Sequence, residues 1–485
     1  MVDDQGCGGV AHTVESTVRA PAEEAGELAP NRATAARQLA RFARDIYAHG
    51  APESVTGRAA EILVDQLGLQ IGCARLAWCE AVHDYVCSVR SEGPSTVLVH
   101  GARAHPEVAA FANATFGHGQ DFDDTCMKVQ THAGAVVVPV ALAVGEAVGA
   151  HGSELVRAIV AGLEVMLRAA HAVSPDCLRR GHHTPPAAGP FGAAVAAGLL
   201  MGFDEDELVR ALAIAGSFSG GLIEYTQGGG SVKRIHTAIP TTAGIRAAHL
   251  ARAGLTGPET VLCGTKGFCR VFADDPRPGR LTDGLGATFL IEDVGLKAYN
   301  CCYFIHSPLE ALLAIVREQG LRPEEIASIA VGTSAHGTVH VGSIPEPIDA
   351  LGAQFSTHFT LALALLREPP SLDSYGPEQL EDREVRELAR RVTVHEDPIA
   401  TAEYPTNWGA NVTVTTVTGG RYERRVRYPL GTAENPMSTD QVYEKFDRNV
   451  TPVVGPEKAR KLRTMVGDIT GITDLRELTA LTVVA

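Results

Sequence analysis

A chain of 485 residues with 45% hydrophobic residues can bury a large core, and this length predicts two or three domains or one large domain with an insertion. The formal net charge of −15 and the lack of a basic block argue against a nucleic-acid partner. The sequence has no apolar run of 18 residues, which argues against a membrane span. The ten cysteines form no C-x-x-C pair, which favours reduced thiols in a cytoplasmic protein over a disulfide framework or a zinc site.

The N-terminal two thirds of the chain has a helical pattern. Residues 1–35 lack the basic start and apolar run of a signal peptide and are predicted to form a flexible tail. Residues 36–292 form the first part of a predicted helical domain that is rich in alanine and poor in aromatic residues, as in tightly packed helix bundles. Its predicted helices are 52–72, 133–148, 153–172 with Ser153 as N-cap, the Ala/Gly-rich 192–202, and a helix capped by Asp204 that ends near 216.

The pattern changes after Leu290 to short β-branched segments with helices between them. Predicted strands are 328–334, 392–395, 412–418 and 422–428, with a Gly419-Gly420 turn, and predicted helices are 308–319, 355–367 and 377–390. After Pro436 the helical pattern returns, with Ser438 as a cap and a last helix near 474–481. We therefore predict a mainly α protein: a large helical domain built from both ends of the chain (36–292 and 431–485), with an inserted α+β lid domain at 293–430.

The stretch FGHGQDFDDTCMKVQTH at 116–132 places three aspartates, a threonine, a lysine and two histidines between apolar segments. Ionisable groups in such a setting need partners, and their pKa values shift. The letters DFDDT resemble the motif of a dehalogenase-type phosphatase or of a terpene cyclase, but no buried strand precedes them and the chain has only two tryptophans for a carbocation pocket. Two interpretations remain: a loop of acid–base residues that acts on a polycarboxylate, or an Asp-rich helix cap.

Three further polar clusters favour the first interpretation. Two histidines at 182–183 precede an Ala/Gly-rich helix, a position that suits anion binding. Lys233, Arg234 and His236 follow three glycines, although this spacing is not that of a phosphate loop. The segment KAYNCCYFIH at 297–306 lies where the helical pattern gives way to the α+β pattern, which is a natural place for a cleft.

Taken together, these segments resemble the MmgE/PrpD family, whose members include 2-methylcitrate dehydratase, cis-aconitate decarboxylase and iminodisuccinate epimerase. The resemblance is carried by HGQDFDDT and the TH after it, GHHTPPAAGPFGAA, SVKRIH, TGPETVL before GTKGF, and LKAYNCCYFIHSPLEA. It extends from about Arg37 to the C-terminal helices. It implies the helical domain plus lid, a homodimer, and a site without metal or organic cofactor.

The resemblance also implies the site residues. The catalytic set would be Asp121, Thr125, His132, His183 and Lys233, and the substrate-binding set Lys297, His306, Arg234 and His236. The chain departs from the family pattern at five points, namely the seven-residue spacing from Thr125 to His132, Ala133, Cys302, Tyr303 and Phe359. The loss of a cation and a hydroxyl among these indicates a less charged or differently shaped substrate.

The sequence therefore predicts a cofactor-independent lyase that removes a proton next to a carboxylate of a small di- or tricarboxylate and then expels water or carbon dioxide. His132 and His183 would be the acid–base pair, because the pKa of an unperturbed imidazole lies near neutral pH. Lys233 and Lys297 would bind carboxylates, Asp121 would orient a histidine, and Thr125 would hydrogen-bond the substrate. The alternatives are epimerisation of a dicarboxylate by two opposed histidines, or a non-catalytic carboxylate-binding protein.

Overall fold

The computed structural model describes residues 33–484 except residue 229, so nearly all of the predicted N-terminal tail lies outside the described residues. The chain is mainly helical with one small mixed sheet, as predicted. The described residues from Thr34 onward cluster in one compact unit. The division of this unit into a helical domain and a lid stays a prediction, although its buried apolar residues fall into three separate clusters.

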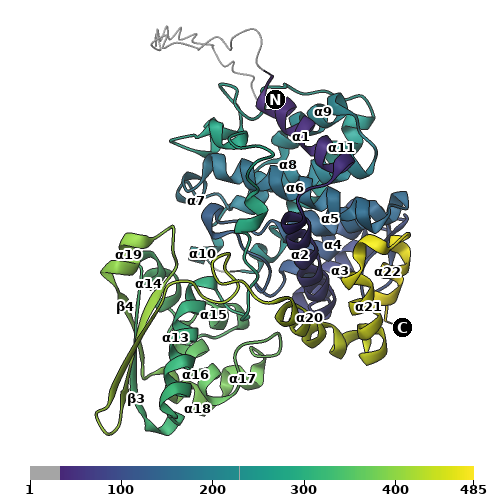
Figure 1. The fold of residues 1–485 in the computed structure, drawn as a ribbon. Coiled ribbons are helices and arrows are strands. Elements are labelled where there is room, and N and C mark those ends of the chain that lie inside the picture. The colour runs from purple at the N-terminus through teal and green to yellow at the C-terminus, as the bar shows by residue number, and fades with distance from the viewer. Residues whose placement is uncertain (1–32, 229, 485) are drawn as a thin grey trace, which may run out of the picture. The chain divides into compact units, whose positions relative to one another are not determined.

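The largest apolar cluster joins helices from both ends of the chain. Helix α20 packs along α2 (Figure 1), so the C-terminal segment returns to the N-terminal helices. The helices of this part are α1 Ala35–His49, α2 Glu53–Gly72, α3 Ala77–Ser88, α4 Pro106–His118, α5 Gly134–Val148, α6 Gly152–Val173, α7 Asp176–Arg179, α8 Thr184–Leu200, α9 Glu205–Ala215, α10 Tyr225–Gly228, α11 Ala238–Arg252, α12 Phe268–Phe272, α20 Thr439–Val454, α21 Pro456–Gly467 and α22 Leu475–Thr482. A two-stranded antiparallel pair, β1 Ser95–Thr96 and β2 Arg103–Ala104, lies between α3 and α4.

The second and third clusters belong to the segment between residues 301 and 426. Its strands are β3 Ile326–Thr333, β4 Val392–Glu396, β5 Ala410–Thr416 and β6 Arg421–Val426, in the order β4-β3-β5-β6, with β3 and β4 parallel and the other pairs antiparallel. Its helices are α13 Tyr303–Gln319, α14 Ala335–Gly342, α15 Ala350–Gln354, α16 Thr357–Leu366, α17 Pro377–Glu381, α18 Arg383–Ala389 and α19 Pro398–Glu403.

One face of the four-stranded sheet is covered and the other is open. Helix α13 contacts β5 and β6, and α16 contacts β4 (Figure 1). Along β5 every second residue is buried, which is the alternation expected of a sheet with one solvated face. The predicted turn between β5 and β6 is confirmed, because Gly419 adopts φ +86° there.

Several predicted helix ends are confirmed and two predictions are wrong. Asp204 caps α9 by accepting from Glu207 N at 2.8 Å, and Ser438 caps α20. Ser153 is not a cap, because α6 begins at Gly152 and the Glu154 carboxylate accepts from the N–H of His151. The single helix predicted at 377–390 is two, since the Asp382 side chain accepts from Glu384 N and starts a new helix.

The Ala/Gly-rich helix α8 is longer than predicted and lies at the centre of the bundle. It begins at Thr184 and packs against α5, α6, α9 and α11. A Cβ added at Gly192 would lie 2.5 Å from the carbonyl oxygen of Gly162 in α6 and 2.7 Å from Cβ of Met166. The two backbones approach so closely that only glycine fits at this crossing, as the composition predicted.

We expect Gly192→Ala to lower the free energy of unfolding by ~1–3 kcal/mol, because the added methyl group overpacks a rigid crossing. The matched control is Gly57→Ala in α2, where an added Cβ meets no atom within 4 Å. This control should be neutral or stabilising by up to ~1 kcal/mol. Thermal unfolding midpoints of both variants measure the difference, and equal midpoints would contradict the close crossing.

Candidate active site

The polar stretch at 116–132 leaves the end of α4 and is held by contacts from distant parts of the chain. Thr125 pairs with Gly295 through two backbone hydrogen bonds of 2.8 and 2.9 Å. From α20, Lys445 Nζ donates to the carbonyl oxygens of Phe122 and Lys297 at 2.8 and 2.9 Å and pairs with the Asp65 carboxylate at 2.6 Å. These contacts fix the loop beside the segment that carries Lys297.

Asp121 is a buried carboxylate between two lysines. Its Oδ1 lies 2.6 Å from Lys233 Nζ and 3.3 Å from Lys297 Nζ. Lys297 Nζ also donates to the backbone oxygen of Asp121 at 2.6 Å, and Asp121 adopts the left-handed conformation with φ +55°. Burial alone would raise the pKa of Asp121, but the two ammonium groups outweigh it and hold this pKa far below its usual range. The structure therefore brings three of the predicted residues into one ion cluster.

Asp123 lies between two histidines. It is fully buried, and its Oδ2 accepts from His118 Nδ1 at 2.8 Å and lies 3.2 Å from His132 Nδ1. His132 Nδ1 also lies 2.9 Å from the backbone oxygen of Asp124 and 3.3 Å from Thr125 Oγ1. Burial lowers the pKa of His118 to about 4, so its imidazole is neutral at pH 7.

Asp124 has the structural role that the helix-cap interpretation described. Its carboxylate accepts from Gly134 N at 2.8 Å and Ala135 N at 3.1 Å, in the first turn of α5, and from Gln66 Nε2. Burial and the neighbouring Asp123 raise the pKa of Asp124 to about 7. Asp124 therefore caps α5, while Asp121 and Asp123 face lysines and histidines.

His183 and His236 form a second imidazole pair. Their Nδ1 atoms are 2.9 Å apart, so one ring donates to the other, and the ring of Tyr225 lies within 6 Å of both. The rings of His132 and His183 have centroids 6.3 Å apart. Burial and Lys233 lower the pKa of His183 well below its usual value and that of His236 to about 4. The two histidines predicted as the acid–base pair, His132 and His183, are thus neighbours.

Two predicted substrate-binding residues contact protein groups instead of the ion cluster. The guanidinium of Arg234 lies 3.5 Å above the Trp78 ring and donates to the carbonyl oxygen of Gly119. The ring of His306 is buried and stacked on Tyr303, with centroids 4.5 Å apart. Burial and Lys297 lower the pKa of His306 to about 3.

Sequence reasoning missed three residues that the structure places in or beside this cluster. His118 and Asp123 belong to the motif stretch. Their spacing could have indicated the contact, because it puts a histidine at the end of α4 and a carboxylate in the loop after it. Lys445 lies more than 300 positions later in α20, and nothing in its local sequence distinguishes it.

Among the residues that the structure describes, two groups of side chains bring donor atoms within 4.8 Å of one another, as in a metal site: His118, Asp123 and His132, and Glu80, His83 and His100. In the first group the short contacts run from ring nitrogens to oxygens that only accept, so both Nδ1 atoms carry protons. In the second group the two imidazole rings are stacked 3.8 Å apart and nearly parallel, so their in-plane lone pairs do not converge. In this arrangement the ring contacts of both groups are made to protein groups.

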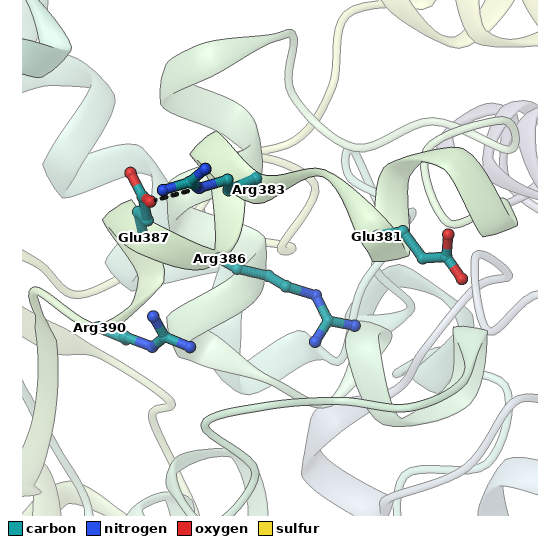
Figure 2. Close-up of a pocket in the computed structure, with 5 residues that line it drawn as sticks. All are labelled: Glu381, Arg383, Arg386, Glu387 and Arg390. Atoms are coloured by element: carbon teal, nitrogen blue, oxygen red, sulfur yellow. Dashed lines mark hydrogen bonds and ion pairs between the residues drawn. The ribbon is translucent and has the colours of Figure 1, made fainter.

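A hollow of about 570 Å³ lies elsewhere, on α17 and α18. Figure 2 shows its lining residues, Glu381, Arg383, Arg386, Glu387 and Arg390. Arg383 pairs with Glu387 at 2.8 Å, and three arginines and two glutamates line the hollow. In the described structure none of these five side chains bonds to the Asp121 cluster, so the hollow is separate from the candidate site.

The buried histidines predict a loss of stability in mild acid. The folded-state pKa values of His118, His236 and His306 lie at about 4, 4 and 3, below the value of about 6.5 expected in the unfolded chain. Each ring therefore takes up a proton on unfolding below pH 6.5, and stability falls as the pH decreases toward 4. Each such proton contributes up to about 1.4 kcal/mol per pH unit.

Denaturant unfolding at pH 7, 6 and 5 measures this slope. His306→Phe keeps an aromatic ring on Tyr303 but cannot bind a proton, so its slope should be smaller than that of the wild type. Equal slopes for the two proteins would contradict the buried neutral imidazole.

Comparison with known proteins places the chain in a family. Residues 37–281 match the MmgE/PrpD N-terminal domain, and residues 299–470 match the MmgE/PrpD C-terminal domain. The chain is 26% identical to a cis-aconitate decarboxylase of Aspergillus terreus over 466 residues, which cover 91% of this chain and 94% of that protein. It is 26% identical to the cis-aconitate decarboxylase-like protein oryM of Aspergillus oryzae, with 92% and 96% covered.

The human cis-aconitate decarboxylase is 27% identical over 390 residues, which cover 78% of this chain and 80% of that protein. Among the described residues, no helix is both long and apolar enough to cross a membrane. The two domain matches cover most of the chain, and the protein belongs to the MmgE/PrpD family.

Proposed function

We propose that this protein is a lyase that acts on a small di- or tricarboxylate, removes a proton next to a carboxylate, and expels carbon dioxide or water. The observation that carries this proposal is the ion cluster: two lysine ammonium groups converge on one buried carboxylate, with two histidines nearby. The relatives named cis-aconitate decarboxylase support the same class of reaction.

The lysines would bind the substrate carboxylate. Lys233 and Lys297 lie within 3.3 Å of Asp121 Oδ1, so the position of that oxygen is one where two cations stabilise negative charge. A substrate carboxylate that approaches these ammonium groups competes with Asp121 for them. The same cations would stabilise the enolate-like state that forms when the neighbouring C–H bond breaks.

The histidines would move the protons. His132 Nδ1 faces oxygens that only accept, Asp123 Oδ2 and the carbonyl of Asp124, so Nδ1 carries the proton and Nε2 keeps its lone pair. His132 is therefore the base of the proposed pair. His183, which shares a proton with His236, would act as the acid toward the leaving group.

Two separate imidazoles also suit a second candidate, an epimerase in which one histidine removes a proton and the other returns it from the opposite face. The homodimer implied by the family resemblance and the cytoplasmic location remain predictions.

A panel of di- and tricarboxylates in deuterium oxide tests the proposal. A lyase should release carbon dioxide or form an alkene, whereas an epimerase should incorporate deuterium without loss of mass elsewhere. No turnover and no exchange with a bound acid would indicate a carboxylate-binding protein and would contradict catalysis. Activity should survive exhaustive EDTA treatment, and a loss restored by a divalent ion would contradict the expected metal-free site.

Lys233→Met keeps the side-chain length and removes the charge. We expect KM to rise about 10- to 100-fold, because a hydrogen bond to a charged group contributes ~1.5–3 kcal/mol, and kcat to fall if the contact strengthens as the enolate forms. The matched control is Lys128→Met in the polar stretch at 116–132, because Lys128 is exposed and pairs with Asp293 at 3.0 Å. Such a surface pair contributes ~0–1 kcal/mol, so kcat/KM of the control should stay unchanged.

Raising the ionic strength should weaken substrate capture by the wild type more than by Lys233→Met. The double variant Lys233→Met/Asp121→Asn removes both charges of the buried pair and so restores charge balance. If it were stable and fully active, Lys233 would serve only to neutralise Asp121, and its role in substrate binding would be wrong.

A further inference from the structure

The proposed proton transfer does not use Asp123, one of two fully buried acids of the motif. Asp123 has no solvent-exposed surface, and its Oδ2 lies between His118 Nδ1 at 2.8 Å and His132 Nδ1 at 3.2 Å. Its Oδ1 has no hydrogen-bond partner among the described residues. A buried carboxylate with only half of its acceptors used is costly, so its retention needs an explanation.

Asp123 is ionised in this setting. Burial alone would raise the pKa of Asp123, but the two imidazoles hold it well below its usual range. The ionised carboxylate places a negative charge 3.2 Å from His132 Nδ1, where it would attract a cationic ring. The neutral form has its tautomer fixed already, because the Asp124 carbonyl oxygen lies 2.9 Å from the same nitrogen. The two acceptors on Nδ1 thus have separable effects: the carbonyl sets the tautomer, and the carboxylate supplies charge.

We propose that Asp123 is a positioning residue of the reaction, whose carboxylate stabilises the imidazolium that His132 becomes when its Nε2 accepts the substrate proton. This inference rests on the proposed function. In that step the substrate C–H bond breaks and an Nε2–H bond forms, while the electron pair stays on the substrate carbon. Asp123 remains ionised throughout and takes no proton.

His118 completes the arrangement from the other side. Its Nδ1 donates to the same oxygen that faces His132, and its own Nε2 has no partner among the described residues. Because the pKa of His118 is lowered to about 4 by burial, this ring stays neutral when His132 gains a proton. The neutral His118 ring therefore holds the Asp123 carboxylate in place and leaves its negative charge available to His132.

The neighbouring carboxylates provide a matched pair of variants. Asp123→Asn removes the charge, can keep an oxygen at the Oδ2 position, and then places an NH2 group at the Oδ1 position, which has no partner among the described residues. Asp124→Asn alters an equally buried carboxylate whose partners are the α5 backbone and Gln66, and it leaves the Asp124 carbonyl in place. Both variants should lower the thermal midpoint, so stability alone does not distinguish them.

Kinetics of the folded enzymes distinguishes them. Asp123→Asn should lower kcat by ~10²–10⁴-fold with KM changed less than about threefold, because the charge acts on the proton transfer and not on carboxylate binding. Asp124→Asn should keep kcat within about threefold of the wild type. Equal kcat values for Asp123→Asn and Asp124→Asn would overturn the proposal.

A second measurement does not depend on turnover. In full-length protein with ¹⁵N-labelled histidine, the His132 signal is identified by its loss in His132→Gln, and its protonation is followed as the pH is lowered. Asp121, His118 and His183 also face His132, and both variants retain them. Protonation of His132 should require a lower pH in Asp123→Asn than in the wild type, and Asp124→Asn should show a smaller change.

The outcomes separate the two proposals. If no acid of the panel is turned over but the His132 signal moves as expected, the reaction is wrong and the contact between Asp123 and His132 is confirmed. If the wild type is active and neither kcat nor the His132 signal responds to Asp123→Asn, the lyase stands and the positioning role is overturned.

Discussion

The buried charge of Asp121 is the constraint on which the rest of the site depends. An ionised carboxylate inside a protein requires paired cations, and removal of one partner of such a pair typically costs ~3–5 kcal/mol. Lys233 and Lys297 meet this requirement from segments 112 and 176 positions away in the chain. The ion cluster therefore fixes the positions of three segments relative to one another: the motif loop, the region before α11 and the entry to α13. The left-handed φ of Asp121 persists because these contacts over-determine it.

Lys445 extends the same constraint to the C-terminal helices. Its ammonium group holds the carbonyl oxygens on either side of the cluster while the Asp65 carboxylate balances its charge. Close by, the chain returns from the sheet-containing segment at Gly431, whose carbonyl oxygen accepts from Leu296 N at 2.8 Å. An added Cβ at Gly431, with φ +95°, would lie 1.8 Å from the Leu296 oxygen, so only glycine fits. The chain segments that enter and leave that part of the structure thus lie side by side at Leu296, next to Lys297.

The sequence predicted those structural features that depend on residue types within a few positions. The cap of α9 at Asp204, the glycine turn between β5 and β6, and the close crossing at Gly192 follow from residue types within a few positions. The break at Asp382 was missed because an acidic residue within a helical pattern does not reveal whether it caps a new helix. The assignment of Asp124 to capping and Asp123 to histidine contacts depends on which side chain faces α5, and the letters DFDDT do not contain that information. Lys445 has no signal at all, since its role arises only when α20 packs on α2.

The charge balance of the cluster indicates how an anionic substrate would activate it. In the described structure two lysines face the ionised Asp121, and two histidines face the ionised Asp123. His118, His183 and His236 are kept neutral by burial and, for each of the three, by the nearby Lys233. A substrate carboxylate on Lys233 would offset the positive charge that lowers the pKa of His183, so that pKa would rise toward the working range. Binding would then recruit a proton to the ring proposed as the acid. The negative charge of the bound carboxylate would disfavour loss of a proton from the neighbouring carbon. This cost is offset only if the developing enolate contacts the lysines more closely than the substrate in its ground state does. The cluster therefore favours reaction only if the lysines bind the transition state more tightly than the substrate, which is the condition for catalysis by a fixed electrostatic site.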